Sequence, residues 1–289
     1  MSTLGELVQN ENRLVQAVVY APAKVGKTFG AGTFPRPNWI DFDKGISTLA
    51  GPDFIRKYGW KPELLYGQFH EGAMTPRGVV TQATAFDQAC AYFDEWMKPG
   101  KRDQFDTWVI DTGTFLAEAA MNKALVLLSP KGGFQGIKSN TLEQGVQHGL
   151  VVPKLQDYGS ERSMVEQFIT MVKASGKHVL FLCHEKEIRD KEGNVTKIVP
   201  LLTGQSVDVI NAMFDDVWRL ERKFSVVGGK RVMNTVLCIA SPKALGDGGF
   251  MAGSRLGVPD GTAWEWDAIS KALAALRAER TALTTPTKE

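Results

Sequence analysis

The chain has 289 residues and a mass of 31.7 kDa, which allows one large domain or two small ones. Hydrophobic residues make up 43% of the sequence and charged residues 23%, as in packed domains, so extensive disorder is excluded. The formal net charge of +2 is too small for a uniformly basic molecule, so any nucleic-acid-binding surface must be a local patch.

Nothing in the sequence predicts a membrane-bound or secreted protein. No stretch reaches the roughly 18 uninterrupted apolar residues of a membrane-spanning helix, and the start, MSTLGELVQNENR, has no apolar signal core. Three cysteines, Cys90, Cys183 and Cys238, lie far apart and form no CxxC pair. This argues against a disulfide framework or a cysteine zinc site, and a cytoplasmic protein is expected.

Short apolar runs rich in β-branched residues recur along the chain and predict strands at 14–20, 38–42, 107–110, 178–183, 217–220 and 235–240. Most are continuous rather than alternating, as in strands buried on both faces of a parallel sheet. Helical patterns lie between them, most clearly at 81–97, 114–128 and 160–175, the last with Ser160 as its N-cap. This alternation predicts an α/β fold with a mainly parallel central sheet flanked by helices.

Three segments depart from this alternation. Residues 129–158 are polar, rich in glycine and long for a loop, which indicates a functional or mobile segment. Residues 185–204 predict a hairpin that turns at residues 192–194. The polar, proline-containing residues 278–289 are expected to form a flexible C-terminal tail. Since no repeat or linker is visible, residues 1–277 are interpreted as a single domain.

Residues 21–28, APAKVGKT, directly follow the first predicted strand and precede a helical stretch. They match the phosphate-loop pattern G-x-x-x-x-G-K-[ST], except that Ala21 replaces the first glycine. In such a loop Gly26 lets backbone N–H groups close around a phosphate, Lys27 neutralises the β- and γ-phosphate oxygens, and Thr28 ligates Mg²⁺. The alternative is an ordinary strand–turn–helix with a chance GKT. The preceding strand favours binding of ATP with Mg²⁺ by Ala21, Pro22, Ala23, Lys24, Val25, Gly26, Lys27, Thr28 and Phe29.

A second acidic group is needed to hold the metal ion, and it should end an apolar strand. Asp111 ends the run TWVID, so Thr28 and Asp111 form the predicted Mg²⁺ site, with Asp111 in a Walker-B role. The alternative is a strand-end aspartate that caps a helix. The next residue is Thr112 rather than a carboxylate that acts as general base. The protein therefore either binds nucleotide without hydrolysing it or takes the base from another strand.

The segment 40–43, IDFD, ends the strand after the phosphate loop and offers that base. Alternation puts Asp41 and Asp43 on one side of this strand, where a carboxylate would face the γ-phosphate. Asp43, the further out, is the predicted water-activating residue, and the alternative is a solvated pair beside Lys44. His184 follows the run VLFLC and is the predicted γ-phosphate sensor, with a purely structural histidine as the alternative.

The order of these motifs resembles that of the RecA-like phage ATPases, a group that includes single-strand annealing proteins of phage recombination. The motifs are the phosphate loop, Ile40 to Asp43, Asp111-Thr112, Cys183-His184, FDDV at 214–217 and SRLGVP at 254–259. The resemblance implies a RecA-like P-loop NTPase sheet, ATP with Mg²⁺, single-stranded DNA as partner, and nucleotide sites shared between subunits of an oligomer. It also implies a single-strand DNA-binding protein as a further partner.

The chain departs from that family at three positions. RecA itself has glutamate where this chain has the shorter Asp43, and a polar amide where it has His184. Ala21 replaces the usual first glycine of the loop. Because of these departures, the resemblance does not imply that this chain hydrolyses ATP rapidly.

Basic residues gather between residues 219 and 255, where seven Lys and Arg stand against two acidic residues. This local excess of +5 exceeds the net charge of the whole chain. One interpretation is a solvated face. The functional interpretation has Arg255 reach a neighbouring subunit's γ-phosphate as an arginine finger, while Lys230 and Arg231 contact DNA phosphates.

By the same resemblance, DNA contacts lie in the loops after the Walker-B and sensor strands. The first loop is 129–158, with Lys131, Phe134 and Lys138, and the second is 185–204, with Lys186, Arg189, Lys191 and Lys197. An exposed Phe134 would stack on a base, whereas a folded-back Phe134 would cover the core.

The sequence as a whole predicts a DNA-stimulated ATPase, a RecA-like protein that binds single-stranded DNA in phage recombination, annealing or replication. Its predicted catalytic residues are Lys27, Asp43, Asp111, His184 and Arg255. Two alternatives stay open. One is a hexameric helicase or helicase loader on the same core, and the other is a nucleotide-dependent, DNA-binding scaffold with little turnover.

Overall fold

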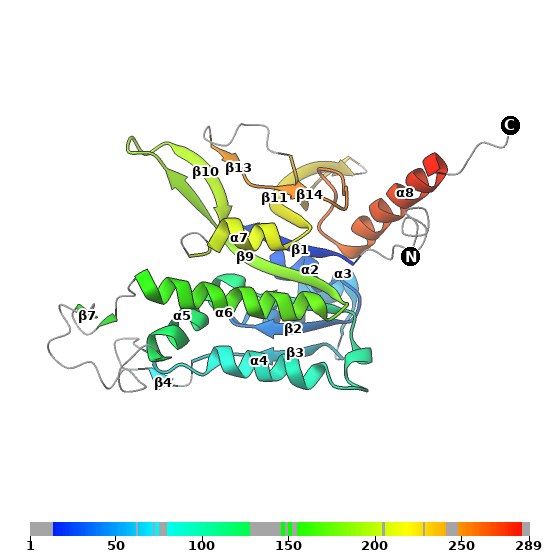
Figure 1. Cartoon of the computed structure of the whole chain (residues 1–289). Helices are drawn as coiled ribbons and strands as arrows, with labels where there is room; N and C mark the ends of the chain where they lie inside the picture. The colour runs from blue at the N-terminus through cyan, green and yellow to red at the C-terminus, as the bar shows by residue number, and fades with distance from the viewer. Residues whose placement is uncertain are drawn as a thin grey trace.

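The structure is a computed structural model, and it describes residues 14–61, 63–71, 73–74, 80–127, 146–147, 150–151, 155–203, 206–227, 229–240 and 248–284. A ten-stranded sheet runs through the molecule (Figure 1). Its main strands lie in the order β12-β11-β1-β9-β6-β2-β3, and it also includes β10, which pairs with β9 and β13, and β14, which pairs with β11.

The strands that carry the candidate site are parallel to one another. They are β1 (Gln16–Ala21), β2 (Pro37–Asp41), β3 (Leu65–Gln68), β6 (Thr107–Asp111), β9 (His178–Arg189) and β11 (Asp216–Val227). The antiparallel additions are β10 (Val195–Pro200) on β9, and β12 (Lys230–Cys238) and β14 (Gly253–Ser254) on β11, while β13 (Gly249–Phe250) is parallel to β10. Two separate pairs are β4 (Ala73–Met74) with β5 (Val80–Gln82), and β7 (Val146–Gln147) with β8 (Leu150–Val151).

Helices pack on both faces of the sheet (Figure 1). One face is covered by α4 (Ala85–Trp96), α5 (Gly113–Leu127), α6 (Leu155–Ala174) and α7 (Ser206–Met213). The other carries α2 (Lys27–Ala31), the 3₁₀ helix η1 (Gly45–Ala50), α3 (Pro52–Tyr58) and α8 (Trp266–Thr284). A short 3₁₀ helix, η2 (Arg102–Gln104), precedes β6. The predicted α/β fold with a mainly parallel sheet flanked by helices is confirmed.

Several predicted boundaries differ from the structure. Helix α6 includes residues 155–159, so Ser160 lies inside the helix and is not its N-cap. Residues 81–82 belong to strand β5 rather than to the helix after it. Helix α8 continues to Thr284, where a flexible tail from residue 278 was expected, because the Ala, Leu, Arg and Glu of this stretch all favour helix.

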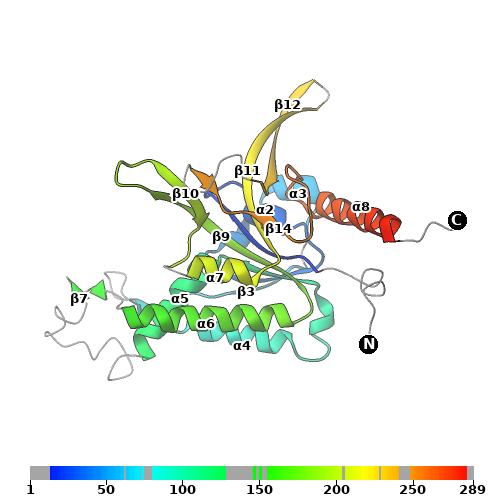
Figure 2. The ribbon, with the colours of Figure 1, turned by 45° about the horizontal axis from the view of Figure 1, so that its top comes forward.

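Two hairpins extend beyond the parallel core (Figure 2). The predicted hairpin at 185–204 is confirmed, since β9 and β10 pair antiparallel and the chain turns at residues 190–194. The second is formed by β11 and β12, which are far longer than the predicted strands at 217–220 and 235–240. Both hairpins begin at the sheet edge where β1 ends, and they bring additional side chains to that edge.

Helix α2 packs against Trp264 so closely that Gly30 has no room for a side chain. A Cβ on Gly30 would lie 2.2 Å from Trp264 Cδ1, and the same indole donates a hydrogen bond from Nε1 to the carbonyl of Lys27 at 3.0 Å. We expect Gly30→Ala to lower the free energy of unfolding in urea by about 1–3 kcal/mol, the usual cost of overpacking. The control is Gly159→Ala in α6, where a Cβ meets no atom within 4 Å. If Gly30→Ala unfolds at the same urea concentration as the wild type, the close packing of Gly30 against Trp264 is contradicted.

Candidate functional site

The loop between β1 and α2 has the backbone conformation of a turn that only glycine adopts easily. Gly26 has φ +110°, and the exposed Lys24 also lies in the left-handed region at φ 64°. Lys27 is buried, and its Nζ donates hydrogen bonds to the carbonyls of Ala21 at 3.1 Å and Pro22 at 3.2 Å. Burial lowers the pKa of Lys27. The Lys27 ammonium is thus held inside the concave side of the loop.

The register of the parallel strands places the predicted site residues side by side at the edge of the sheet where β1, β2 and β6 end. Ala21 at the end of β1 is paired with His184, and Asp41 at the end of β2 is paired with Asp111 at the end of β6. Thr28 Oγ1 donates a hydrogen bond to Asp111 Oδ2 at 2.7 Å. The two residues predicted to hold Mg²⁺ are therefore in direct contact.

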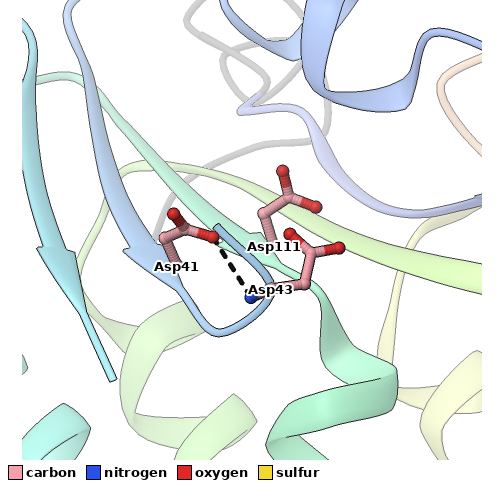
Figure 3. Close-up of side chains that lie close together, drawn as sticks. All are labelled: Asp41, Asp43 and Asp111. Atoms are coloured by element: carbon pink, nitrogen blue, oxygen red, sulfur yellow. Dashed lines mark hydrogen bonds between the residues drawn. The ribbon is translucent and has the colours of Figure 1, made fainter. Parts of the chain in front are cut away.

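Three aspartates converge at this edge (Figure 3). Oxygens of Asp41, Asp43 and Asp111 lie within 4.8 Å of one another. Asp41 maintains the turn after β2, because its Oδ1 accepts hydrogen bonds from the backbone N–H groups of Asp43 and Gly45, and its Oδ2 accepts one from Gln68. Asp43 is only half-buried, and its Oδ1 accepts a hydrogen bond from the Gly45 N–H at 2.8 Å.

The donor set fits a divalent cation. Asp111 Oδ1 is buried without a hydrogen-bond partner. Burial and, after it, the nearby Asp43 carboxylate raise the pKa of Asp111 to about 8. A Cβ on Gly45 would lie 2.7 Å from Asp43 Oδ1 and 2.8 Å from Asp111 Oδ2, so the glycine leaves open a space that faces both carboxylates. Thr28 and Asp111 would hold Mg²⁺ here, with hard oxygen atoms as that ion prefers.

The protonation of Asp111 gives a pH dependence that can be measured. A carboxyl with a higher pKa in the folded than in the unfolded protein binds more protons when folded, here between pH values of about 4 and 8. Without metal and nucleotide, the free energy of unfolding should therefore fall as pH rises through this range. Asp111→Asn should reduce that fall, as measured by urea unfolding in EDTA at pH 6 and pH 8.5. If the free energy of unfolding falls by the same amount in Asp111→Asn as in the wild type, Asp111 is not the group that causes the pH dependence.

His184 joins the loop lysine to the acidic cluster. Its Nδ1 lies 3.5 Å from Lys27 Nζ, and its Nε2 lies 3.9 Å from Asp43 Oδ2. Burial, and then the neighbouring Lys27 charge, lower the pKa of His184, so the ring is neutral at pH 7. His184 was expected at a strand end but lies within β9, where pairing with β1 stops and the hairpin with β10 begins. His184 thus lies at the junction between the parallel sheet and that hairpin.

A cavity of about 710 Å³ unites these groups. Its lining consists of the predicted loop residues 24–29 together with Asp43, Thr48, Asp53, Asp111, His184, Arg222, Met233 and Thr235. Arg222 was noted in the sequence only as part of a basic cluster, and Met233 and Thr235 were not identified. All three come from the hairpin of β11 and β12, whose length was underestimated. Residues 219–227 read RLERKFSVV, and the three consecutive charged residues at 221–223 interrupt the alternation that would have predicted a longer strand.

Arg255 lies away from this cavity within the chain. Its backbone N–H donates to the Asp215 carbonyl, and its guanidinium pairs with the Asp215 carboxylate at 3.4 Å. Because Ser254 pairs with Asp216, at the start of β11, Arg255 lies at the edge of the sheet opposite the phosphate loop. It can contribute to a nucleotide site only in another subunit.

The other predicted DNA contacts divide into three groups. Lys131, Phe134 and Lys138 lie outside the described residues. In the hairpin of β9 and β10, Lys186 donates to the carbonyl of Leu202, and Arg189 pairs with Glu187. In that of β11 and β12, the Arg231 guanidinium lies over the Phe224 ring. Of the described basic residues, those on β9 thus already have protein partners.

Comparison with known proteins supports the nucleotide site. A family model described as an AAA domain matches residues 13–239, which include the phosphate loop, the acidic cluster and the hairpin of β11 and β12. The chain belongs to this family. As an AAA domain with an intact Gly-Lys-Thr, it is a P-loop NTPase.

The other comparisons carry no further argument. Among solved structures, the crystal structure of the RadB recombinase is similar, with 16% sequence identity, coverage of 77% of this chain and 86% of that chain, and a TM-score of 0.38. No curated protein matches the sequence. Among the described helices, none has the length and apolar character needed to cross a membrane.

Proposed function

We propose that this P-loop NTPase hydrolyses ATP with Mg²⁺ in the 710 Å³ cavity and couples hydrolysis to single-stranded DNA, as a RecA-like protein of recombination, annealing or replication. The observation that carries the proposal is the hydrogen bond between Thr28 and Asp111, beside the buried Lys27 and opposite Asp43. An ordinary strand–turn–helix has no reason to gather these groups, since each buried charge costs free energy.

Each group has a distinct role in the proposed reaction. Backbone N–H groups of the loop and the Lys27 ammonium bind the β- and γ-phosphate oxygens. Thr28 and Asp111 would hold Mg²⁺, which when bound would supply positive charge to the same oxygens. Asp43 accepts the proton of the attacking water, and the neutral His184 beside it detects whether the γ-phosphate is present. Lys27 and Asp111 thus act on the charge of the phosphates, whereas Asp43 acts on the attacking water.

The direct test is steady-state phosphate release from ATP, with and without Mg²⁺ and with and without a single-stranded oligonucleotide. We expect Mg²⁺-dependent turnover that the oligonucleotide increases. Assays of strand annealing and of duplex unwinding then separate the two DNA roles. Annealing supports a recombination role, and unwinding supports a helicase or helicase-loader role. Turnover that is absent in every condition, despite tight ATP binding, would leave the scaffold function instead. Two observations favour the scaffold function. No carboxylate follows Asp111 in the sequence, and Asp43 Oδ1 already accepts a hydrogen bond.

Nucleotide sites shared between subunits are part of the proposal, because Arg255 is too far from the phosphate loop of its own chain. Arg255→Ala should bind ATP normally yet lose DNA-stimulated turnover. Mixing it with Lys27→Ala should restore part of the activity, since the Lys27 variant still donates Arg255 to a neighbour's intact loop. Phosphate release by the two variants, alone and mixed, measures this. A fully active monomer, or a mixture without rescue, would remove Arg255 from the site.

A further inference from the structure

The hairpin of β11 and β12 extends well past the sheet that supports it (Figure 2). Strand β1 pairs with β11 only from Asp216 to Arg219, whereas β12 pairs with β11 all the way from Arg219 to Val227. Beyond Arg219, β11 therefore pairs only with β12 in the part of the chain that the structure describes. The outer half of the hairpin is a two-stranded ribbon, which presents two faces to its surroundings.

One face of this ribbon begins in the nucleotide cavity. Cross-strand pairing places Arg222 opposite Thr235, Phe224 opposite Met233 and Val226 opposite Arg231. Because side chains alternate along a strand, these six share one face, called here the hairpin face. Its inner members Arg222, Thr235 and Met233 line the cavity, and its outer members continue from there. The hairpin face thus forms a continuous track out of the nucleotide site.

The outer part of the hairpin face combines exposed apolar surface with positive charge. Phe224 is 55% exposed and Met233 is 48% exposed. The Arg231 guanidinium lies over the Phe224 ring, 3.9 Å from its centroid, which is cation–π contact. From residue 222 to residue 233 the sequence contains four basic residues and no acidic one, against a net charge of +2 for the whole chain. Cationic side chains beside an exposed aromatic ring are the arrangement that binds single-stranded nucleic acid without sequence preference.

We propose that the hairpin face binds the single strand, with a base stacked on Phe224 and a backbone phosphate on Arg231. This assignment rests on the proposed function, which names single-stranded DNA but not its surface. We place the contact here rather than on the predicted loop at 185–204, where Arg189 already pairs with Glu187 and Lys186 donates to the Leu202 carbonyl. An exposed aromatic ring beside Arg231, on a ribbon whose residues 222–233 carry four basic side chains and no acidic one, matches a polyanion with exposed bases.

The base of the same face holds the phosphate loop. Arg222 donates a hydrogen bond from Nη2 to the Lys24 carbonyl, and Thr235 Oγ1 donates one to the Val25 carbonyl at 2.8 Å. A strand bound further out on this ribbon would shift two hydrogen bonds that fix the loop beside Gly26. Nucleotide and single strand should therefore change each other's affinity by the same factor, as linkage requires.

The test is the affinity of a fluorescein-labelled oligothymidylate for the full chain, measured by anisotropy with a non-hydrolysable ATP analogue present. Phe224→Ala and Phe224→Leu should each weaken binding about 5- to 150-fold, the range for one base–aromatic stack, while Phe224→Tyr should retain it. Arg231→Ala should reduce the slope of log K against log salt by about 0.7. Matched controls are Trp60→Ala, another exposed aromatic at 60%, and Arg102→Ala, an exposed arginine beside the start of β6.

The outcomes separate this inference from the proposed function. If the wild-type chain binds no oligothymidylate, the proposed DNA partner fails first. If the wild type binds and all Phe224 variants bind equally well, the strand lies elsewhere and the hairpin face is overturned. If Phe224→Leu matches the wild type while Phe224→Ala lowers the oligomeric state in sedimentation, the face contacts a second copy of the chain instead, which also overturns the assignment.

Discussion

Lys27→Ala is expected to reduce ATP hydrolysis by at least about 10²- to 10³-fold, the effect of removing one preorganised charged donor from a site of this kind. The Lys27 ammonium is buried within the phosphate loop, 3.1 Å from the Ala21 carbonyl and 3.5 Å from His184 Nδ1. Alanine leaves the β- and γ-phosphate charges without this counter-ion, so nucleotide affinity should fall as well. Phosphate release and binding of a fluorescent ATP analogue measure the two effects.

The control for Lys27→Ala is Lys98→Ala, which removes the same charge from an exposed salt bridge with Glu95. Surface pairs of this type contribute little, so turnover and stability should stay near those of the wild type. Wild-type turnover in Lys27→Ala would remove the phosphate loop from the mechanism. Loss of ATP hydrolysis in Lys98→Ala would show that removing any lysine charge impairs the protein. The loss in Lys27→Ala would then say nothing about the phosphate loop.

The core of the fold was predictable because buried parallel strands have a simple signature. Continuous apolar runs located β1, β2, β6 and the inner part of β9, and in the structure these strand segments are buried on both faces apart from Gln16 and His178, the first residues of β1 and β9. Since the carboxyl ends of parallel strands share one sheet edge, the polar residues that follow those runs had to meet there. The contact between Thr28 and Asp111 is a direct consequence of that rule.

The parts of the site on the hairpin of β11 and β12 were not predictable in the same way. Lys223, Phe224 and Val226 are exposed, so no burial pattern distinguishes this ribbon from a loop. That Arg222 and Thr235 approach the phosphate loop depends on the register of a two-stranded hairpin, which local sequence specifies only weakly. Arg255 was predicted to reach the γ-phosphate of a neighbouring subunit, and its place beside β14, at the edge opposite the phosphate loop of its own chain, leaves this a prediction.

Asp43→Asn is expected to leave ATP bound while slowing the chemical step about 10²- to 10⁴-fold, the contribution of a general base. Asparagine keeps the size of the side chain and an oxygen that accepts the Gly45 hydrogen bond, so the turn after β2 should persist. It loses the basicity needed to accept a proton from water. Single-turnover hydrolysis with nucleotide pre-bound measures the chemical step separately from binding.

Asp41→Asn is the matched comparison, because the two carboxylates lie two residues apart in the same turn. Both Asp41 oxygens already accept hydrogen bonds, from the Asp43 and Gly45 N–H groups and from Gln68, and burial raises the pKa of this carboxyl. A group so placed supports the turn, and its amide should mainly lower stability rather than the single-turnover rate. Asp43 instead lines the cavity with His184 3.9 Å from its second oxygen. Should Asp41→Asn stall hydrolysis while Asp43→Asn does not, Asp41 is the base and Asp43 belongs to the turn.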